Sequence, residues 1–352
     1  MRISFSFISR LSLLGLLVLC LVACGSTGGN TNTTSTTHKT VAQGGTKSTP
    51  RAAPGKITEF DLPAPLVGGQ DTITAGSDGN LWFTYQTTTG ENGVGRITPT
   101  GQTKVVASFP LQDRPLEIVT GSDGNVWFTT IAGELGRITI DPTNKFKFTG
   151  FAGGSGFYTI NDITTGPDGN LWYTRGIAIM RITPSAGSPT STVTPFPLSP
   201  TSSPNQIAAG PDGNLWFTED AAIGRITPTG TVTAFALPTA HSDPAGITAG
   251  PDGNLWFAQE GTDQLGRITP KGSITEFALP GFTTPTDITA GPDGNLWFTD
   301  QDKAAIGRIT PTGKVTTFSL HAPAGDVTIG PDKNIWFTEG TLANTGIGYI
   351  TL

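Results

Sequence analysis

One nine-residue phrase recurs seven times and sets the strongest limit on the fold of this chain. It reads GPDGNLWFT at 210–218 and at 291–299, and near copies stand at 76–84, 121–129, 166–174, 250–258 and 330–338. The seven tryptophans of these copies follow one another at spacings of 45, 45, 44, 40, 41 and 39 residues. Such a period is typical of four-stranded propeller blades. We therefore expect one array of seven blades and not two or three separate domains.

Each repeat has room for four strands. In the fourth copy we predict strands at 206–210, 215–219, 223–227 and 231–238, separated by PDGN and PTG turns. Proline presets φ in such turns, aspartate accepts backbone hydrogen bonds, and glycine takes positive φ. The Leu-Trp-Phe run has no polar interruption, which indicates a strand buried on both faces. The predicted class is all-β, with four antiparallel strands per blade and the tryptophans as core residues.

The two ends of the repeat region predict a closed ring. ITEFDLP at 57–63 matches ITEFALP at 274–280 at six of seven positions, yet it precedes the first full repeat. The chain ends in IGYITL (347–352), a third strand without a fourth. We expect the N-terminal piece to supply that fourth strand, because closure removes a free sheet edge. Residues 56–352 would then form a seven-bladed propeller.

The first 55 residues predict export and anchoring. Arg2 and Arg10 flank the start, an apolar run follows, and Leu-Val-Ala-Cys at 21–24 is similar to a bacterial lipobox. We expect 1–23 to be a lipoprotein signal peptide, Cys24 to be lipidated, and the Gly/Ser/Thr-rich stretch to residue 55 to be a disordered tether. An ordinary secretory signal is the alternative. The expected location is the bacterial cell envelope outside the cytoplasm, with membrane lipid bound through Cys24.

Charge and cysteine content limit the classes of partner and of reactive site that this chain can have. The formal net charge is −6, so nucleic acid is not an expected partner. Cys20 and Cys24 are the only cysteines, so residues 56–352 contain no disulfide or thiolate site. We expect a monomer. Arginine recurs once per blade in the third strand, at 96, 137, 181, 225, 267 and 308, and we interpret it as a structural contact, for example to a turn aspartate.

Function in a repeat fold is expected where the copies differ and their side chains converge. The connections from fourth to first strands and from second to third strands share one face, here called the loop face, and they are variable and acidic. The ligand-binding candidates on it are Glu117, Asp162, Glu219, Glu260, Asp287, Asp300, Asp326 and Glu339. Asp287, Asp300, Asp326 and Glu339 are also candidate ligands for magnesium or calcium, which prefer oxygen donors. A solvated acidic rim is the alternative.

The repeat resembles a known family. GITAGPDGNLWFAQE followed by LGRITPKGSITEFALP (246–280) is similar to the repeat of the streptogramin lyases, also called virginiamycin B lyases, and the similarity spans residues 57–352. The resemblance implies a seven-bladed propeller that opens cyclic streptogramin B antibiotics by metal-assisted elimination. It also implies a histidine base, which removes a proton beside a carbonyl that the metal polarises.

This chain departs from the family pattern at the positions that would carry the chemistry. The two family histidine places fall on Gly325, or Ala324 with a shifted gap, and on Thr286. The metal carboxylate places fall on Pro323 and Gly340, and a family tyrosine place falls on Asp71. His321 lies in the connection that leads into the first strand of the seventh blade, and it is a weak candidate for a displaced base.

Three functional hypotheses remain. The first is a lipoprotein whose acidic loop face binds an unknown small molecule or protein. The second is a metal-dependent lyase whose catalytic set has moved, with His321 as its base. The third is a rigid spacer in the cell envelope. The missing histidines favour the first hypothesis over the second, and the variable acidic face favours it over the third.

Overall fold

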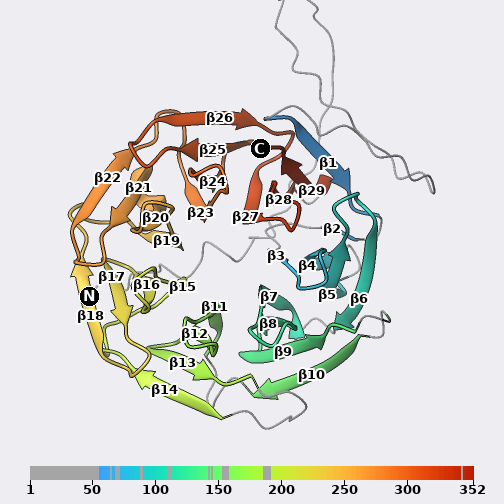
Figure 1. The fold of residues 1–352 in the computed structure, drawn as a ribbon, viewed down its shortest axis with the longest axis horizontal. Helices are drawn as coiled ribbons and strands as arrows, with labels where there is room; N and C mark the ends of the chain where they lie inside the picture. Colours follow the sequence, from blue (N-terminus) through green and yellow to red (C-terminus); the bar gives the residue numbers. More distant parts are fainter. Residues whose placement is uncertain are drawn as a thin grey trace, which may run out of the picture. The chain divides into compact units, whose positions relative to one another are not determined.

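A computed structural model describes residues 55–63, 66–67, 72–87, 90–109, 113–141, 143, 146–152, 158–184, 192–341 and 344–352. In this part of the chain, seven antiparallel sheets form a ring, with their first strands around the central axis and their fourth strands at the rim (Figure 1). The predicted all-β, seven-bladed propeller is confirmed. No helix among these residues is long and apolar enough to cross a membrane. The signal peptide, Cys24 and the tether to residue 54 lie outside the described residues.

The first four blades follow the repeat in order. Blade 1 contains β3 (Ile73–Ala75), β4 (Leu81–Thr87), β5 (Asn92–Ile97) and β6 (Thr103–Phe109), and the short β2 (Leu66–Val67) pairs with β4. Blade 2 contains β7 (Pro115–Thr120), β8 (Val126–Thr130), β9 (Glu134–Thr139) and β10 (Lys147–Ala152). Blade 3 contains β11 (Ile160–Thr165), β12 (Leu171–Arg175), β13 (Ala178–Ile182) and β14 (Val193–Pro197). Blade 4 contains β15 (Ile207–Ala209), β16 (Leu215–Glu219), β17 (Ala222–Ile226) and β18 (Val232–Ala236).

The last three blades include a short 3-10 helix and the ring closure. Blade 5 contains β19 (Pro244–Ala249), β20 (Leu255–Gln259), the 3-10 helix η2 (Glu260–Thr262), β21 (Gln264–Ile268) and β22 (Ile274–Ala278). Blade 6 contains β23 (Pro285–Ala290), β24 (Leu296–Asp300), β25 (Ala305–Ile309) and β26 (Val315–Ser319). Blade 7 contains β27 (Ala324–Ile329), β28 (Ile335–Thr341), β29 (Asn344–Ile350) and the N-terminal strand β1 (Ile57–Asp61).

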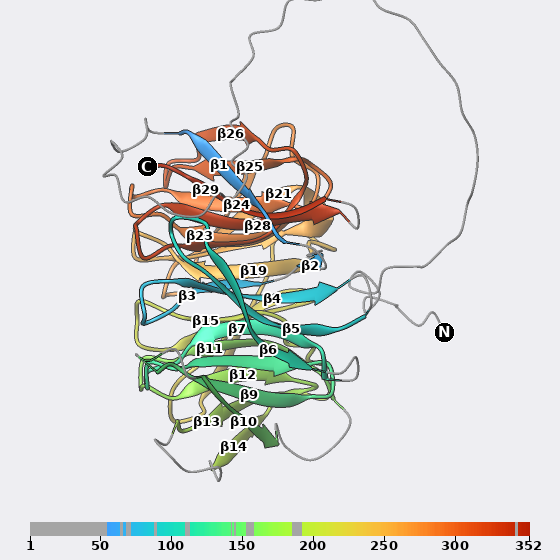
Figure 2. The same cartoon turned by 90° about the vertical axis from the view of Figure 1, so that its right-hand side faces the viewer.

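The N-terminal strand closes the ring as predicted. β1 pairs antiparallel with β29, with Ile57 opposite Ile350 and Asp61 opposite Gly346 (Figure 2). The ring of Phe60 stacks on Trp336 at 6.0 Å between centroids, so the strand also fills the core of its blade. The last sheet is thereby completed by residues nearly 300 positions earlier in the chain, and β29 has no unpaired edge.

The tryptophans form the contact between successive blades. All seven are fully buried, and each packs against the next sheet. Trp216 of blade 4, for example, packs with Ile247, Leu255 and Phe257 of blade 5. Burial of this size at each junction dominates the stability of a fold that has few charged contacts. The interpretation of the tryptophans as core residues is confirmed.

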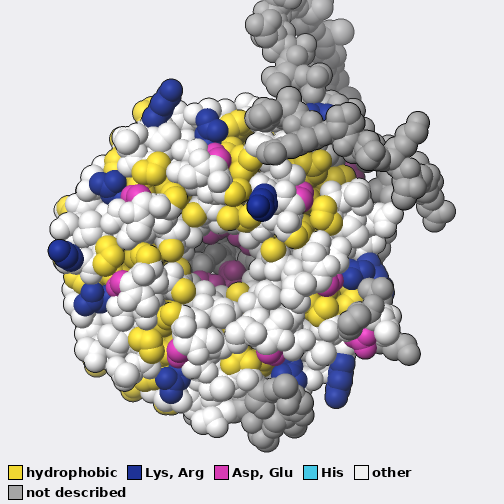
Figure 3. Space-filling view, in the orientation of Figure 1, with side chains coloured by type: hydrophobic (Ala, Val, Ile, Leu, Met, Phe, Trp, Pro, Cys, Tyr) yellow, Lys and Arg dark blue, Asp and Glu magenta, His cyan; other side chains and the backbone are white. Residues whose placement is uncertain are grey.

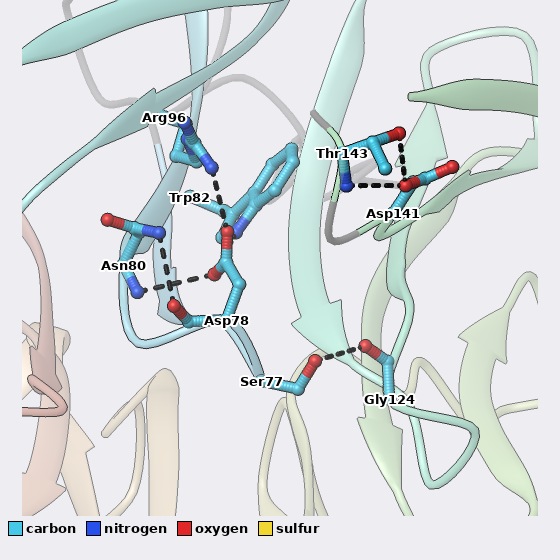
Figure 4. Close-up of polar contacts among 8 residues, drawn as sticks. All are labelled: Ser77, Asp78, Asn80, Trp82, Arg96, Gly124, Asp141 and Thr143. Atoms are coloured by element: carbon cyan, nitrogen blue, oxygen red, sulfur yellow. Dashed lines mark hydrogen bonds and ion pairs between the residues drawn. The ribbon is translucent and has the colours of Figure 1, made fainter. Parts of the chain in front are cut away.

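The repeated turns lie on the face opposite the loop face and have one hydrogen-bond pattern. In every blade the indole N–H of the tryptophan donates to the turn aspartate at 2.9–3.2 Å. In blade 1, Asp78 also accepts from Asn80 and from Arg96 (Figure 4). Burial alone would raise the pKa of Asp78, but the hydrogen bonds from Trp82, Asn80 and Arg96 outweigh it and lower the pKa. The nine-residue repeat therefore has a structural role: its aspartate and glycine form the turn, and its tryptophan fills the core.

The recurring arginines belong to the same module, as predicted. Arg225 lies 5.5 Å from the ring centres of both Trp216 and Phe235 and donates to the Pro270 carbonyl of the next blade at 2.9 Å. In four blades the arginine also forms an ion pair with the turn aspartate of its own blade. A guanidinium that contacts two stacked rings and a neighbouring backbone carbonyl is a structural element and not a free ligand-binding group.

Candidate functional site

The loop-face ends of the first strands form a ring of seven residues around the axis. This axial ring consists of Thr72, Glu117, Asp162, Gln206, Gly246, Asp287 and Asp326. In six blades its backbone N–H donates to the hydroxyl of the second-strand threonine, twelve residues later, at 3.0–3.1 Å. Blade 5 is the exception, because Ala258 replaces that threonine. The final threonine of the repeated phrase therefore holds the axial ring in place.

Three of the axial carboxylates, those of Asp162, Asp287 and Asp326, accept a hydrogen bond from the next blade. Asp162 accepts from Ile163 of its own strand and from Ile207 of blade 4, both at 2.7 Å. Asp326 accepts in the same way from Val327 at 2.8 Å and from Ile73 of blade 1 at 2.7 Å. A carboxylate that accepts two buried N–H groups satisfies donors that would otherwise be costly. Part of the predicted ligand-binding acid set is thus engaged in blade assembly.

Asp287 and Asp326 form a coupled acid pair beside the axis. Asp287 also accepts from the Val327 N–H, at 3.0 Å, so the two carboxylates share a donor. Burial raises the pKa of Asp326 well above its usual value, and the negative charges of Asp287 and Glu117 raise it further. Asp326 therefore holds its proton to a higher pH than an exposed aspartate does. Figure 3 shows acidic side chains inside the central opening of the ring.

The other predicted acids have different surroundings. Asp300 is fully buried and accepts from the backbone of Thr283, Thr284 and Asp302 at 2.7–3.2 Å, which orders the connection between β22 and β23. Glu219 is half-buried at the end of β16, and burial raises its pKa. Glu260 begins η2 on blade 5. Only part of the predicted set therefore faces solvent.

A second acid cluster occupies the loop-face end of blade 7. Glu59 of β1 is only 6% exposed at its side chain and contacts His321 Nδ1 through Oε2 at 2.5 Å. Burial, and then the charges of Glu59 and Asp61, raise the pKa of Glu339 to about 8. Glu59 Oε1 and Glu339 Oε2 are buried and have no hydrogen-bond partner. Glu339 and His321 were predicted from the sequence, but Glu59 was not, although the match between 57–63 and 274–280 aligns it with Glu276.

Blade 5 shows the neutral form of the same arrangement. Glu276 occupies the place of Glu59, and Gln259 occupies the place of Glu339, three residues after the tryptophan. Gln259 Nε2 donates to Glu276 Oε1 at 3.0 Å, and the Thr239 hydroxyl donates to Oε2 at 2.7 Å. Blade 7 has a carboxyl group where blade 5 has an amide donor. Its acid pair therefore needs a proton, which explains the raised pKa of Glu339.

The four predicted metal ligands do not share one environment. Asp287 and Asp326 belong to the axial ring, Asp300 orders a loop, and Glu339 lies beside Glu59. Within the described residues, no three His, Cys, Asp or Glu side chains group closely enough to hold a metal ion. The four acids look equivalent in the sequence, but the closed ring places them in three different surroundings.

The two family histidine places lie next to each other on blades 6 and 7. The Thr286 hydroxyl is 3.0 Å from that of Thr299, and Thr299 donates to the Gly325 carbonyl at 3.1 Å. Thr299 thus joins the two places across the blade junction. Neither Thr286 nor Gly325 has a side chain that can take a proton near neutral pH. Thr286 and Gly325 therefore supply no base at these two places.

Comparison with known proteins identifies the family. The model of the virginiamycin B lyase family matches residues 47–150 and 152–352. The chain belongs to the virginiamycin B lyase family. A search of curated proteins gave no significant match.

Solved structures agree with this family assignment. A streptogramin B lyase structure is 31% identical, with a TM-score of 0.72, over 84% of this chain and 97% of that one. A catalytically inactive histidine-to-alanine variant of virginiamycin B lyase from Staphylococcus aureus, solved with quinupristin, is 32% identical, with a TM-score of 0.73, over 84% and 99%. The extracellular domain of a hybrid two-component system from B. thetaiotaomicron is 19% identical, with a TM-score of 0.64, over 84% of this chain and 43% of that one, and shows the shared fold alone.

Proposed function

We propose that this chain is a ligand-binding member of the virginiamycin B lyase family that uses its acidic loop face and does not open streptogramins. The observation that carries the proposal is the Thr286–Thr299–Gly325 hydrogen-bond chain at the two family histidine places. Removal of a proton beside a carbonyl needs a base near that proton, and these side chains offer none. The inactivity of the histidine-to-alanine variant of the Staphylococcus aureus enzyme supports the same inference.

The ligand class follows from the charge of the face. Glu219 and Glu260 lie at the loop-face ends of blades 4 and 5, with the exposed Asp220 and Asp263 close to them in the chain. A cationic small molecule or a basic segment of a protein complements that charge. Magnesium or calcium is a further candidate ligand of the Asp287–Asp326 pair, because a cation there would offset the repulsion between the two groups.

Calorimetric titration with a short oligolysine peptide tests this proposal, with an oligoglutamate peptide of equal length as the control. We expect only the cationic peptide to bind, with an affinity that falls as salt is added. Glu219→Gln combined with Glu260→Gln should weaken binding, whereas Asp141→Asn, which follows β9 on the opposite face, serves as the single-acid control. Equal binding of both peptides, or of neither, would favour the rigid spacer instead.

A displaced lyase is the second candidate, and one observation favours it. His321 Nδ1 contacts the buried carboxylate of Glu59, and Glu339 beside it carries a raised pKa. A histidine oriented by a carboxylate next to a protonated acid is a reasonable acid–base pair. We rank this function second because His321 occupies a different backbone position from either family place.

We further propose that the protein is exported and anchored in the cell envelope through a lipid on Cys24, as a monomer. The support is the Leu-Val-Ala-Cys string and the Gly/Ser/Thr-rich stretch that follows it. Metabolic labelling with a fatty acid tests the anchor. We expect the label in the natural protein and its loss in the Cys24→Ala variant.

A further inference from the structure

Blade 5 is the blade that departs most from the repeat at its loop-face end. Gly246 stands in its axial ring, and Ala258 replaces the threonine that holds the ring elsewhere. Among the described residues, four that are not glycine have positive φ, and three of them, His241, Asp243 and Asp263, border this end of the blade. Left-handed backbone at such residues persists only where the surroundings fix it, and it is common at binding sites.

Three buried oxygens at this end have no hydrogen-bond donor. They are Oε1 of Gln259, Oε1 of Gln264 and Oγ1 of Thr262. Gln259 and Gln264 are directly opposite each other in the β20–β21 ladder, so their side chains lie on the same face of the sheet. Thr262 lies in the turn that joins the two strands. The three acceptors therefore come from one six-residue stretch.

The orientation of the Gln259 amide is fixed by its neighbour. Its Nε2 donates to the Glu276 carboxylate at 3.0 Å, so the oxygen must point the other way. Gln259 is fully buried, so bulk water does not reach that oxygen. At the adjacent place on blade 6, Asp300 accepts from three backbone N–H groups, and on blade 1 the Tyr85 hydroxyl contacts Ser108 at 2.9 Å. Asn92 of blade 1 has one such amide oxygen, whereas blade 5 has two within one turn.

The local charge is negative. Within the described residues, Glu276 has Gln259 and Thr239 as partners and forms no ion pair with a lysine or arginine. Gly261 of η2 has no room for a side chain, because an added Cβ would lie 2.1 Å from the His241 carbonyl oxygen. Two loops therefore pack closely at this end of the blade, where the described residues include several acceptors and the Glu276 carboxylate.

We propose that a hard divalent cation of the calcium class binds at the loop-face end of blade 5, with the amide oxygens of Gln259 and Gln264 and the hydroxyl of Thr262 as its protein ligands. The proposed ligands belong to blade 5, whereas the family histidine places belong to blades 6 and 7, and the site does not depend on the proposed binding of cationic ligands. It also uses no group of three His, Cys, Asp or Glu side chains, which the described residues lack.

The three neutral oxygen ligands favour calcium over other divalent ions. Calcium accepts neutral carbonyl and hydroxyl oxygens in irregular geometry, whereas magnesium keeps most of its water and zinc prefers nitrogen and sulfur. A single water molecule could donate to only two of the three oxygens and would leave the charge of Glu276 uncompensated. Neutral ligands predict weak binding, with a Kd on the order of 0.1–1 mM.

Calorimetric titration of the chelator-treated protein with calcium chloride tests the site, with magnesium chloride at equal ionic strength as comparison. We expect one calcium per chain and at least a tenfold loss of affinity in Gln259→Met and in Gln264→Met. Gln301→Met, in the corresponding connection of blade 6, is the matched control and should bind like the natural protein. Gln264→Glu adds a carboxylate oxygen and should tighten calcium binding severalfold.

Each result decides the proposal. Absence of calcium binding overturns it, and so does binding that survives Gln259→Met but disappears in Asp326→Asn, which would place the ion in the axial ring. If Gln259→Met fails to fold because Glu276 loses its donor, Gln264→Glu still decides. Tighter binding in that variant supports the site, and unchanged or weaker binding contradicts it.

Discussion

The face that carries the repeated PDGN and PTG turns, here called the turn face, and the loop face contain the same acidic residue types, but these residues have different roles on the two faces. On the turn face every aspartate accepts from the tryptophan four residues later, and the seven copies are nearly identical. On the loop face each acid has its own partners. Asp162 bridges two blades, Asp300 orders a loop, and Glu339 faces another carboxylate. Residues that recur in every copy therefore build the ring. Residues that differ between copies lie where a specific function can arise.

The largest expected effect comes from the closure of the ring. Deleting residues 56–63 removes β1 and exposes β29 and the apolar face of blade 7, including Trp336. We expect a fall in melting temperature of more than about 10 °C, or no folded protein, because a whole strand and its core contact are lost. Thermal unfolding followed by circular dichroism measures it. A melting temperature within one or two degrees of the natural protein would refute closure by this strand.

The next effect compares one aspartate on each face of blade 4. Asp212→Ala leaves the buried Trp216 N–H without an acceptor, and we expect a loss of about 1–3 kcal/mol in unfolding free energy. Asp220→Ala, on the exposed loop of the same blade, should cost less than about 0.5 kcal/mol. Urea unfolding of both variants provides the comparison. Equal losses would mean that the turn face holds no special structural role.

The loss of unfolding free energy in Asp212→Ala should depend on pH. The hydrogen bonds of Trp216 and Asn214 lower the pKa of Asp212 against the opposing effect of burial. A lowered folded-state pKa contributes stability that is present above the ordinary value of 3.8 and is lost as the pH falls through the folded-state value. We expect the difference between Asp212→Ala and the natural protein to shrink at pH 3. A difference that stays constant down to that pH would contradict the hydrogen-bond account.

A smaller effect of opposite sign is expected at blade 7. The pKa of Glu339 is raised from 4.5 to about 8, so the folded state binds an extra proton between these values and stability falls as the pH rises through that window. Glu339→Gln should remove this slope, because the amide can donate to Glu59 as Gln259 does to Glu276. We expect the variant to be more stable at pH 9 by on the order of 1–3 kcal/mol.

Urea unfolding at pH 5, 7 and 9 measures this effect, with Glu134→Gln as an exposed control. The control should follow the natural protein at each pH. A Glu339→Gln variant that is destabilised at pH 9 would show that the Glu59–Glu339 contact does not carry the extra proton.

The sequence predicted the ring because each copy of the phrase carries its own turn, strand and core residue. The loop face was harder to predict, since the partners of its acids come from other blades. Asp162 and Glu219 look alike in the sequence, but only Asp162 meets the N–H of a residue 45 positions later. The contact between His321 and Glu59 spans 262 positions and exists only once the ring has closed. Local patterns do not record which side chains closure brings together.

This chain has the fold of its family, and neither Thr286 nor Gly325 offers a base at the two family histidine places. The most direct test incubates the purified protein with quinupristin and magnesium and separates the products by chromatography with mass detection. Elimination would give an opened product of unchanged mass, whereas hydrolysis would add one water. We predict that quinupristin remains cyclic. Opening of the ring with unchanged mass, abolished by His321→Ala, would contradict this claim and establish the displaced lyase.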